Sequence, residues 1–326
     1  MENVFISNNE IKWCPGCGDY AILQAIQKAF MALNINREKI VIISGIGCAS
    51  RLPYYVNTYG FHTIHGRAAA IATGLKITRP DLSIWIVIGD GDGLSIGLNH
   101  TIQILRKNFN INILLLNNQI YGLTKGQYSP TSPKGKITKS SPYGVLEEPI
   151  NPIKMAFFAG ATFIAREIDT NINNLIFLLK AAYEHEGTSF IEILQNCTIF
   201  NKDNFIQFKD KNLNKDTTLM LKHNSPLIFG ENNNKKLILN KNLLWHISDY
   251  DSIKENNDII IHDIYNENII SELLSNLTYP NFPIPLGIFK AVSKNTYEKS
   301  YYETVNNYNM KYDSENIYMK DQTWML

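Results

Sequence analysis

Four cysteines are the first residues of this sequence whose type and spacing could do chemistry. The chain of 326 residues contains only four, namely Cys14, Cys17, Cys48 and Cys197. The first two form a C-x-x-C pair within WCPGCGD, and each of the others follows a predicted strand. Because the ends of neighbouring parallel strands meet at one edge of a sheet, the four thiols can converge there. The pattern therefore indicates a metal centre, with unrelated buried thiols as the alternative.

The cysteines suit some kinds of site better than others. We expect no disulfide framework, since MENVFISNNEIKWC lacks the basic and apolar parts of a signal peptide. A thioredoxin-like pair is disfavoured because no strand precedes Cys14, and structural zinc usually has two short-spaced ligand pairs rather than one. A [4Fe–4S] cluster needs four thiolates and tolerates long gaps. A helix that opens at Asp19, its expected N-cap, would direct its positive end toward the C-x-x-C pair. These residues favour iron–sulfur only slightly over zinc.

A second candidate site combines glycines and carboxylates at the end of a strand. IGDGDG closes the strand predicted at 84–88, and Asn117 and Asn118 close the next strand along the chain. Ligands of parallel sheets bind beyond the carboxyl ends of strands, where glycines and a helix N-terminus admit a phosphate. Asp90 and Asn118 supply the oxygen ligands that Mg²⁺ prefers. The pattern predicts a magnesium–phosphate site, the alternative being an ordinary turn beside incidental asparagines.

The elements that must position these residues alternate along the first 200 residues. Strands are predicted at 40–44, 84–88, 111–118, 162–166 and 189–195, and helices at 19–33, 65–76, 94–107 and 171–184. This alternation is typical of an α/β fold, a parallel sheet with helices on both faces. Residues 125–150, rich in Lys, Ser, Pro and Gly, are predicted to form a long loop.

The pattern weakens beyond residue 200. We expect short strands within 225–230 and 258–265, a short helix within 268–277 and an extended, proline-rich segment at 279–289. No clear period is present from residue 296 onward. The predicted division is an α/β domain over 1–200 that carries both sites, and a C-terminal extension over 201–326 packed on that domain or on a partner subunit.

Composition excludes several classes of protein. Hydrophobic residues make up 44% of the chain and charged residues 19%, which indicates a globular protein. The formal net charge of +1 provides no overall attraction for nucleic acid or an acidic membrane. No apolar run approaches the roughly 18–20 residues that span a bilayer. We therefore expect a cytoplasmic protein with no nucleic-acid or membrane partner.

The motifs together resemble those of a known family. GDGD followed by NN at this spacing is similar to the thiamine diphosphate motif. With WCPGCGDY, SGIGCASR, HGRA and NNQIYGLTKGQYSPT, the chain resembles the β subunit of 2-oxoacid:ferredoxin oxidoreductases. Within that family it is most similar to the 2-oxoglutarate oxidoreductase (2-oxoglutarate synthase) type. The resemblance covers roughly residues 12–200 and, more weakly, the region to about 300.

The resemblance implies roles for individual residues. All four cysteines match the ligands of a [4Fe–4S] cluster, which lifts iron–sulfur well above zinc. The Mg²⁺ ligands would be the side chains of Asp90 and Asn118 and the carbonyl of Ile120. His65 matches a histidine of the thiamine site, and it could also cap a helix beginning near Gly66, since the two roles are compatible. The residues implied to line the thiamine diphosphate site are Ile46, Gly47, Cys48, Ala49, His65, Gly91, Asp92, Gly122 and Leu123.

The resemblance also implies an activity and a partner. The family oxidises and decarboxylates a 2-oxoacid with CoA, so 2-oxoglutarate would yield succinyl-CoA and CO₂, or the reverse. Electrons would pass through the cluster to ferredoxin. The glutamate that activates the cofactor belongs to an α subunit in this family, and we find no such motif here. The chain is therefore expected to form half of an active site, with an obligatory α subunit.

The choice of 2-oxoacid is a separate question. YGLTKGQ is similar to the 2-oxoglutarate-type loop, and the distal carboxylate of that substrate needs a cation, for which Arg51 and Lys125 are candidates. Ala49 stands where broader-specificity relatives can carry lysine, so pyruvate or broad specificity is an alternative. A non-redox thiamine decarboxylase or carboligase would not use the cysteines, and a zinc-stabilised interaction domain would not use the magnesium motif.

Overall fold

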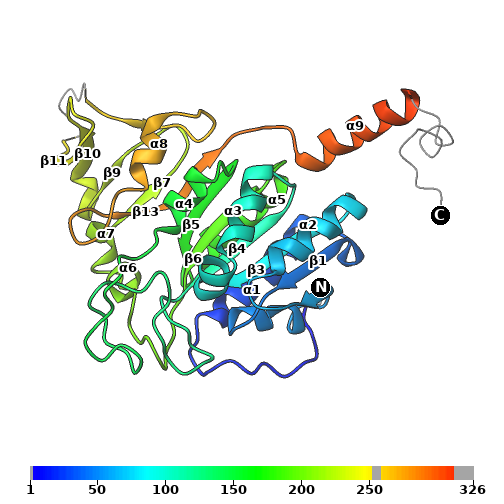
Figure 1. Cartoon of the computed structure of the whole chain (residues 1–326). Helices are drawn as coiled ribbons and strands as arrows, with labels where there is room; N and C mark the ends of the chain where they lie inside the picture. Colours follow the sequence, from blue (N-terminus) through cyan, green and yellow to red (C-terminus); the bar gives the residue numbers. More distant parts are fainter. Residues whose placement is uncertain (1–2, 252–257, 312–326) are drawn as a thin grey trace.

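An eight-stranded sheet forms the centre of the protein. The computed structural model describes residues 3–251 and 258–311. The strand order is β2-β1-β3-β4-β6-β5-β13-β7, and every neighbouring pair is parallel except β13 with β5 (Figure 1). The strands are β1 Ile40–Ser44, β2 Tyr59–His62, β3 Ser83–Gly89, β4 Asn112–Asn117, β5 Phe163–Ile168, β6 Ser189–Leu194, β7 Thr218–Leu221 and β13 Ile284–Ala291. The predicted α/β class is confirmed, with one antiparallel pairing that the sequence pattern did not indicate.

Helices cover both faces of the sheet and explain why its central strands are apolar throughout. All residues of β1, β4 and β6 are buried, as expected for strands enclosed on both sides. One core packs the sheet against α1 (Asp19–Leu33) and α5 (Ile172–Glu184). The other packs it against α2 (Ala68–Thr78), α3 (Leu98–Lys107) and α4 (Pro152–Phe158). Burial of these two apolar surfaces fixes the strand ends relative to each other.

Three local predictions differ from the structure at helix starts. Asp19 is the first residue of α1 and not its N-cap, because Gly18 already has helical φ and ψ and an N-cap side chain needs extended backbone. The helix expected from residue 65 begins at Ala68. The helix expected over 94–107 divides into a π-helical turn, Asp92–Ile96, and α3, with the amide of Gly97 donating to the carbonyl of Asp92 at 3.1 Å.

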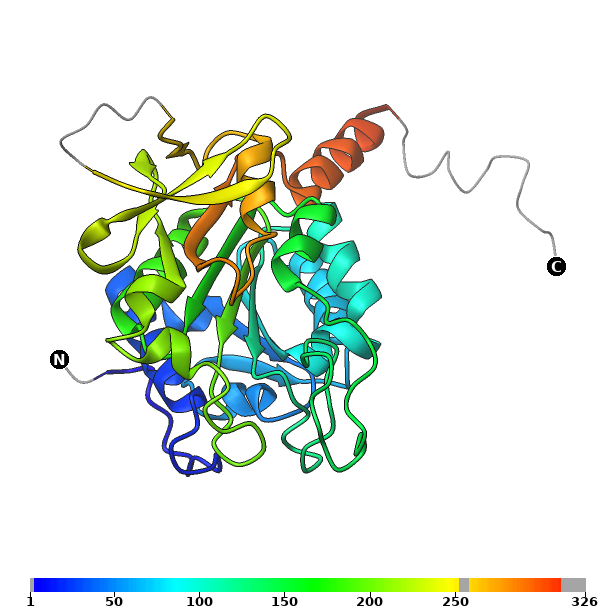
Figure 2. The same cartoon turned by 90° about the vertical axis from the view of Figure 1, so that its left-hand side faces the viewer.

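The loops at the carboxyl ends of the strands gather on one side of the molecule. Figure 2 shows the N-terminal segment, the loop after β4 and the loop after β6 together at the lower end of the sheet. Residues 118–151, between β4 and α4, contain no helix or strand, in agreement with the predicted long loop. Hydrogen bonds within this loop, such as Gly135 N to Val145 O at 2.7 Å, give it a defined course.

The chain beyond residue 200 contributes to the main sheet and builds smaller elements beside it. The extended segment predicted at 279–289 largely becomes β13, which lies between β5 and β7. A three-stranded antiparallel sheet has the order β11-β10-β9, and β12 pairs with β8. The remaining elements are α6 Ile206–Lys209, α7 Asn214–Thr217, β8 Ser225–Pro226, β9 Ile228–Phe229, β10 Lys235–Leu239, β11 Trp245–Asp249, β12 Ile261–His262, α8 Ile269–Leu274 and α9 Tyr297–Lys311. The domain division at residue 200 stays a prediction, and residues 312–326 lie outside the described part.

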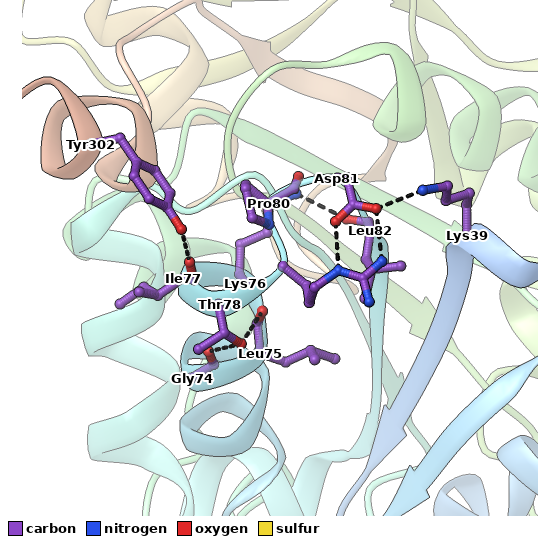
Figure 3. Close-up of polar contacts among 11 residues, drawn as sticks. Lys39, Gly74, Leu75, Lys76, Ile77, Thr78, Pro80, Asp81, Leu82 and Tyr302 are labelled. Carbon is purple, nitrogen blue, oxygen red and sulfur yellow. Dashed lines mark hydrogen bonds and ion pairs between the residues drawn. The ribbon is translucent and has the colours of Figure 1, made fainter. Parts of the chain in front are cut away.

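A helix stands at the opposite, amino-terminal end of the strands, where the sequence showed no period. α9 extends away from the body of the molecule (Figures 1 and 2) and is attached by its first turns. The hydroxyl of Tyr302 donates to the carbonyl of Ile77 at 2.5 Å, at the end of α2 (Figure 3). Glu298 accepts a hydrogen bond from the amide of Asn110 at 3.1 Å. These tertiary contacts, rather than an apolar stripe, position the helix.

Within residues 3–251 and 258–311, no helix combines the length and the hydrophobicity that a membrane-spanning helix requires.

Candidate functional site

A cavity of about 90 Å³ lies at the carboxyl ends of β1, β3 and β4. It is lined by every residue that the sequence assigned to magnesium or to thiamine diphosphate. These are Ile46, Gly47, Cys48, Ala49, His65, Asp90, Gly91, Asp92, Asn118, Ile120, Gly122 and Leu123. Sequence reasoning missed six further lining residues, Asp19, Gly89, Leu116, Tyr121, Thr124 and Gln195. The roles assigned to the predicted residues stay predictions, but their convergence is a property of the fold.

Asp90 provides a buried carboxylate in this cavity. It directly follows β3 and is 2% exposed. Burial raises the pKa of Asp90, while hydrogen bonds from Ser129, Thr131 and the backbone amides act in the opposite direction. Thr131 Oγ1 lies 2.6 Å from Asp90 Oδ2. Because a buried carboxylate is normally paired or bound to a metal, this environment suits a divalent cation.

The turn after β4 separates two adjacent asparagines. Asn118 lines the cavity, and its Oδ1 accepts the amide of Ile120 at 3.1 Å. Asn117 points elsewhere, since its side-chain amide donates to Glu192 Oε1 at 2.7 Å. Successive strand residues face opposite sides, which explains why only Asn118 reaches the cavity. Asp90, Asn118 and Ile120 thus offer an all-oxygen set of donors, which fits Mg²⁺.

Asp92 connects three of the loops that surround the cavity. Its Oδ1 accepts the amide of Gly66 at 2.7 Å and that of Ile46 at 3.3 Å, and lies 2.5 Å from His65 Nδ1. A Cβ on Gly45 would come within 1.9 Å of the same carboxylate, so a glycine is required there. Burial raises the pKa of Asp92, opposed chiefly by the Gly66 amide. Its Oδ2 is buried without a hydrogen-bond partner, as an atom awaiting a ligand would be.

His65 does not cap the helix near Gly66, a role that the sequence had left open beside a cofactor contact. The N-cap of α2 is Arg67, and no side chain caps that helix end. The ring of His65 instead lies between Asp92 and the cavity, with its side chain 37% exposed. The structure therefore excludes the capping interpretation and leaves His65 at the wall of the candidate cofactor site.

Tyr121 is a wall of the cavity that sequence reasoning did not single out. Its hydroxyl donates to the carbonyl of Gly91 at 2.9 Å. A Cβ on Gly91 would come within 2.2 Å of the Tyr121 ring, so the ring fits only against a glycine. Residue type alone did not indicate this contact, since Tyr121 and Gly91 belong to loops that follow different strands.

The cysteine-bearing loops are tied together by hydrogen bonds. The amide of Gly18 donates to the carbonyl of Asn196 at 3.1 Å, which joins the C-x-x-C loop to the loop after β6. Trp13 Nε1 donates to the carbonyl of Cys48 at 2.8 Å, which joins it to the loop after β1. A Cβ on Gly122 would lie 3.7 Å from the sulfurs of both Cys48 and Cys197. The fold thus brings the separate cysteines to one place beside the cavity.

The electrostatics of the thiols show that they share one environment. Burial raises the pKa of Cys48 to about 11, with further contributions from Asp19, Cys197 and Cys14. Burial is also the main cause that raises the pKa of Cys17. The nearby Asp19 and Cys48 raise it further. α1 begins two residues after Cys17, with its N-terminus toward this group, as expected.

In the parts of the chain that the structure describes, no three His, Cys, Asp or Glu side chains form a group that could hold a metal ion. The kind of metal centre that the four cysteines would bind stays a prediction.

The structure does not bring the two candidate substrate cations into the cavity. Arg51 Nη1 donates to the carbonyl of Lys12 at 2.9 Å, and Arg51 is not among the lining residues. Lys125 is exposed, in a left-handed backbone conformation with φ of 76°. Their roles toward a distal carboxylate stay predictions.

Comparisons with known proteins agree with this geometry. Residues 45–193 match the thiamine pyrophosphate enzyme, C-terminal TPP binding domain. The chain is 48% identical to the 2-oxoglutarate oxidoreductase subunit KorB of Mycobacterium tuberculosis over 90% of its own length and 79% of that protein. It is 47% identical to the 2-oxoacid:ferredoxin oxidoreductase 1 subunit beta of Aeropyrum pernix, over 58% of the chain and 59% of that subunit.

A solved structure extends the comparison to the fold. The 2-oxoglutarate:ferredoxin oxidoreductase from Magnetococcus marinus, with 2-oxoglutarate, coenzyme A and succinyl-CoA bound, matches with a TM-score of 0.79 and 32% identity. The match covers 98% of this chain and 95% of that chain. A parallel sheet with this cavity at its carboxyl edge, within the matched domain, defines a thiamine diphosphate enzyme. Within that class, the chain belongs to the family of 2-oxoacid:ferredoxin oxidoreductase β subunits.

Proposed function

We propose that this chain is the β subunit of a 2-oxoglutarate:ferredoxin oxidoreductase. The reaction converts 2-oxoglutarate and CoA to succinyl-CoA and CO₂ and passes the electrons to ferredoxin, and it can run in reverse. One observation carries the proposal: Cys48 lines the cavity assigned to thiamine diphosphate and also lies, with Cys197, beside Gly122. A non-redox thiamine decarboxylase has no use for converging thiols at that wall. The similar Mycobacterium and Magnetococcus proteins are both 2-oxoglutarate oxidoreductases, which supports 2-oxoglutarate as the substrate.

The cofactor half of the site follows from the oxygen donors around the cavity. Asp90, Asn118 and the Ile120 carbonyl would hold Mg²⁺, which in turn would bind the diphosphate. Gly91 and Gly122 keep the cavity wall free of side chains, and Asp92 holds the loops of Ile46 and Gly66 in place. When bound, thiamine diphosphate supplies a carbon nucleophile for the 2-oxo group and accepts the electrons left by decarboxylation.

The redox half of the site follows from the cysteines. Cys14, Cys17, Cys48 and Cys197 would hold a [4Fe–4S] cluster, which supplies one-electron transfer between the cofactor site and ferredoxin. Assembly of the cluster requires the thiols to lose protons, because thiolates are the ligands of iron. Thiols of this kind stay reduced in the cytoplasm, where we place the protein.

The size and surroundings of the cavity support a site completed by a partner. At about 90 Å³ it is far smaller than the roughly 300–1,000 Å³ of most ligand pockets. Exposed apolar side chains occur at and next to its lining residues: Leu123, which lines the cavity, is 46% exposed, and Ile64, which precedes His65, is 76% exposed. Exposed apolar residues next to an incomplete site are typical of a protein interface. The obligatory partner is the α subunit, which would supply the activating glutamate.

The proposal is tested by assaying the chain with and without its α subunit. We expect no reduction of ferredoxin or a viologen dye by the β chain alone with thiamine diphosphate, Mg²⁺ and the cluster present. With the α subunit, reduction should depend on both 2-oxoglutarate and CoA. Substantial turnover by the β chain alone would contradict the proposal that this chain forms only half of the active site. Equal turnover with pyruvate would instead assign broad specificity, and absence of iron and visible absorption after anaerobic purification would contradict the cluster.

A further inference from the structure

Part of the long loop after β4 is buried against the candidate metal ligands. We call residues 129–136 the strap. Ser129, Thr131 and Ser132 are each 2% exposed or less, although serine and threonine in surface loops are usually exposed. Buried hydroxyl groups need hydrogen-bond partners. Their partners lie at the ends of β3 and β4.

Thr131 links the two strand ends that carry the predicted Mg²⁺ ligands. Its Oγ1 lies 2.6 Å from Asp90 Oδ2 and 2.9 Å from Asn117 Oδ1. Its hydroxyl carries one hydrogen, and the bond to the carboxylate is the stronger one because the acceptor is charged. Thr131 therefore restricts which oxygen of Asp90 is available to the cavity.

Two other strap residues hold the turn that contains Asn118 and Ile120. The carbonyl of Gln119 accepts the Ser132 hydroxyl at 2.7 Å and the Lys136 ammonium at 3.1 Å. Gln119 has a φ of 56°, a left-handed conformation that costs a non-glycine residue about 1 kcal/mol or more. The two donors stabilise that conformation, and since Gln119 lies between Asn118 and Ile120, they fix both neighbours.

Lys136 also contributes charge. Burial lowers the pKa of Lys136 to about 8, while the nearby Asp90 carboxylate and Cys197 act to raise it. Its ammonium group thus lies within the electrostatic reach of Asp90. The strap thus places the Thr131 hydroxyl on the Asp90 carboxylate, and the Ser132 hydroxyl and the Lys136 ammonium on the turn at Gln119.

We propose that the strap is the positioning element of the magnesium site: Thr131 orients the Asp90 carboxylate, and Ser132 with Lys136 fixes the turn of Asn118 and Ile120. The inference rests on the proposed function, because it assumes that these residues bind Mg²⁺ and thiamine diphosphate. The strap residues act through the ligands, as outer-shell partners do in metal sites. They are positioning residues rather than catalytic ones.

The test is calorimetric titration of thiamine diphosphate into the αβ complex at several Mg²⁺ concentrations. Thr131→Val keeps the shape of the side chain and removes the hydroxyl. We expect affinity at limiting Mg²⁺ to fall about 10–100-fold, the usual effect of losing an outer-shell partner. Higher Mg²⁺ should restore it, and iron content and visible absorption should not change. Thr131→Ser, which keeps the hydroxyl, should bind like the wild type.

A matched control lies in the same loop. Thr138 contacts the side chain of Ser140 at 3.3 Å on the outer part of the loop, so Thr138→Val should leave the Mg²⁺ dependence unchanged. Ser132→Ala provides a second arm if Thr131→Val does not fold, and it should weaken binding in the same Mg²⁺-reversible way.

The outcomes separate this inference from the proposed function. Failure of the wild-type complex to bind thiamine diphosphate with Mg²⁺ would overturn both. If the wild-type complex binds the cofactor and Thr131→Val binds it with the same affinity, the role proposed for the strap is wrong while the proposed function stands. Ser132→Ala gives the same test if Thr131→Val does not fold. A loss that no Mg²⁺ concentration reverses would also overturn it, since that result describes general disruption of the site.

Discussion

The two ends of the sheet use buried polar groups in different ways. At the carboxyl end, Asp19 Oδ1 and Asp92 Oδ2 are buried without a hydrogen-bond partner, and both residues line one cavity. At the amino end, the buried ammonium group of Lys76 donates to the carbonyls of Pro80 and Leu82, each at 2.9 Å (Figure 3). The amino end satisfies its buried cation internally, whereas the carboxyl end presents oxygen atoms to a cavity.

This difference indicates which end is built for a ligand. An unsatisfied buried polar group costs about 1–3 kcal/mol. Thr296 and Glu298 also bury an unpartnered atom near the amino end, but there the Lys76 ammonium lies near the Glu298 carboxylate. At the carboxyl end, Asp90 and Asp92 both line the cavity, and a bound cation would offset their charge.

The largest expected effect compares one aspartate from each end. Asp90→Ala should reduce thiamine diphosphate affinity by more than about 100-fold, since loss of even an outer-shell partner costs about 10–100-fold. Asp81, which bonds Lys39 (Figure 3) and also Arg79 at the amino end, offers a matched control, and Asp81→Ala should bind the cofactor normally. Calorimetry in the presence of Mg²⁺ measures both. Equal affinities in the two variants would remove the distinction between the ends.

The next largest effect distinguishes the cluster site from the magnesium site, both of which lie at the carboxyl end of the sheet. Cys197→Ser should lose or destabilise the cluster, because an oxygen ligand binds iron less well than a thiolate. Cofactor binding should persist, in contrast to Asp90→Ala, which should keep its iron. Ile199 is 58% exposed, and Ile199→Ser is a neighbouring control that should retain the cluster. Iron and sulfide analysis with visible absorption provides the measurement, and full retention in Cys197→Ser would refute four-cysteine ligation.

The smallest effect comes from a Gly→Ala substitution made once at each end of the sheet. Gly91→Ala would place a Cβ within 2.2 Å of Tyr121, and we expect it to cost about 1–3 kcal/mol of unfolding free energy through overpacking. Gly74, in the exposed part of α2, has open space around its Cβ position. Gly74→Ala should stabilise the protein by about 0.5–1 kcal/mol, because alanine favours helix. Denaturation midpoints of the two variants should shift in opposite directions, and shifts of the same sign would contradict the packing argument.

Much of the candidate site could be predicted from the sequence because its signals are local. The strand predicted at 40–44 and the helix predicted at 19–33 have those bounds in the structure. The motif residues occupy strand ends, and the ends of adjacent parallel strands meet at one edge. Local periodicity and motif spacing were therefore enough to expect that Asp90, Asn118 and Cys48 lie close together.

Local sequence patterns were enough to predict the class of the fold, most strands and helices of the first 200 residues, and most of the residues that line the cavity. They did not indicate β2 or α4. The tertiary structure was needed to show that β13 lies between β5 and β7 and runs antiparallel to β5, that Tyr121 packs on Gly91, and that Thr131 contacts Asp90. These contacts join residues far apart in the chain. Their formation depends on strand order and on the course of the long loop, and neither leaves a periodic signal in the residues themselves.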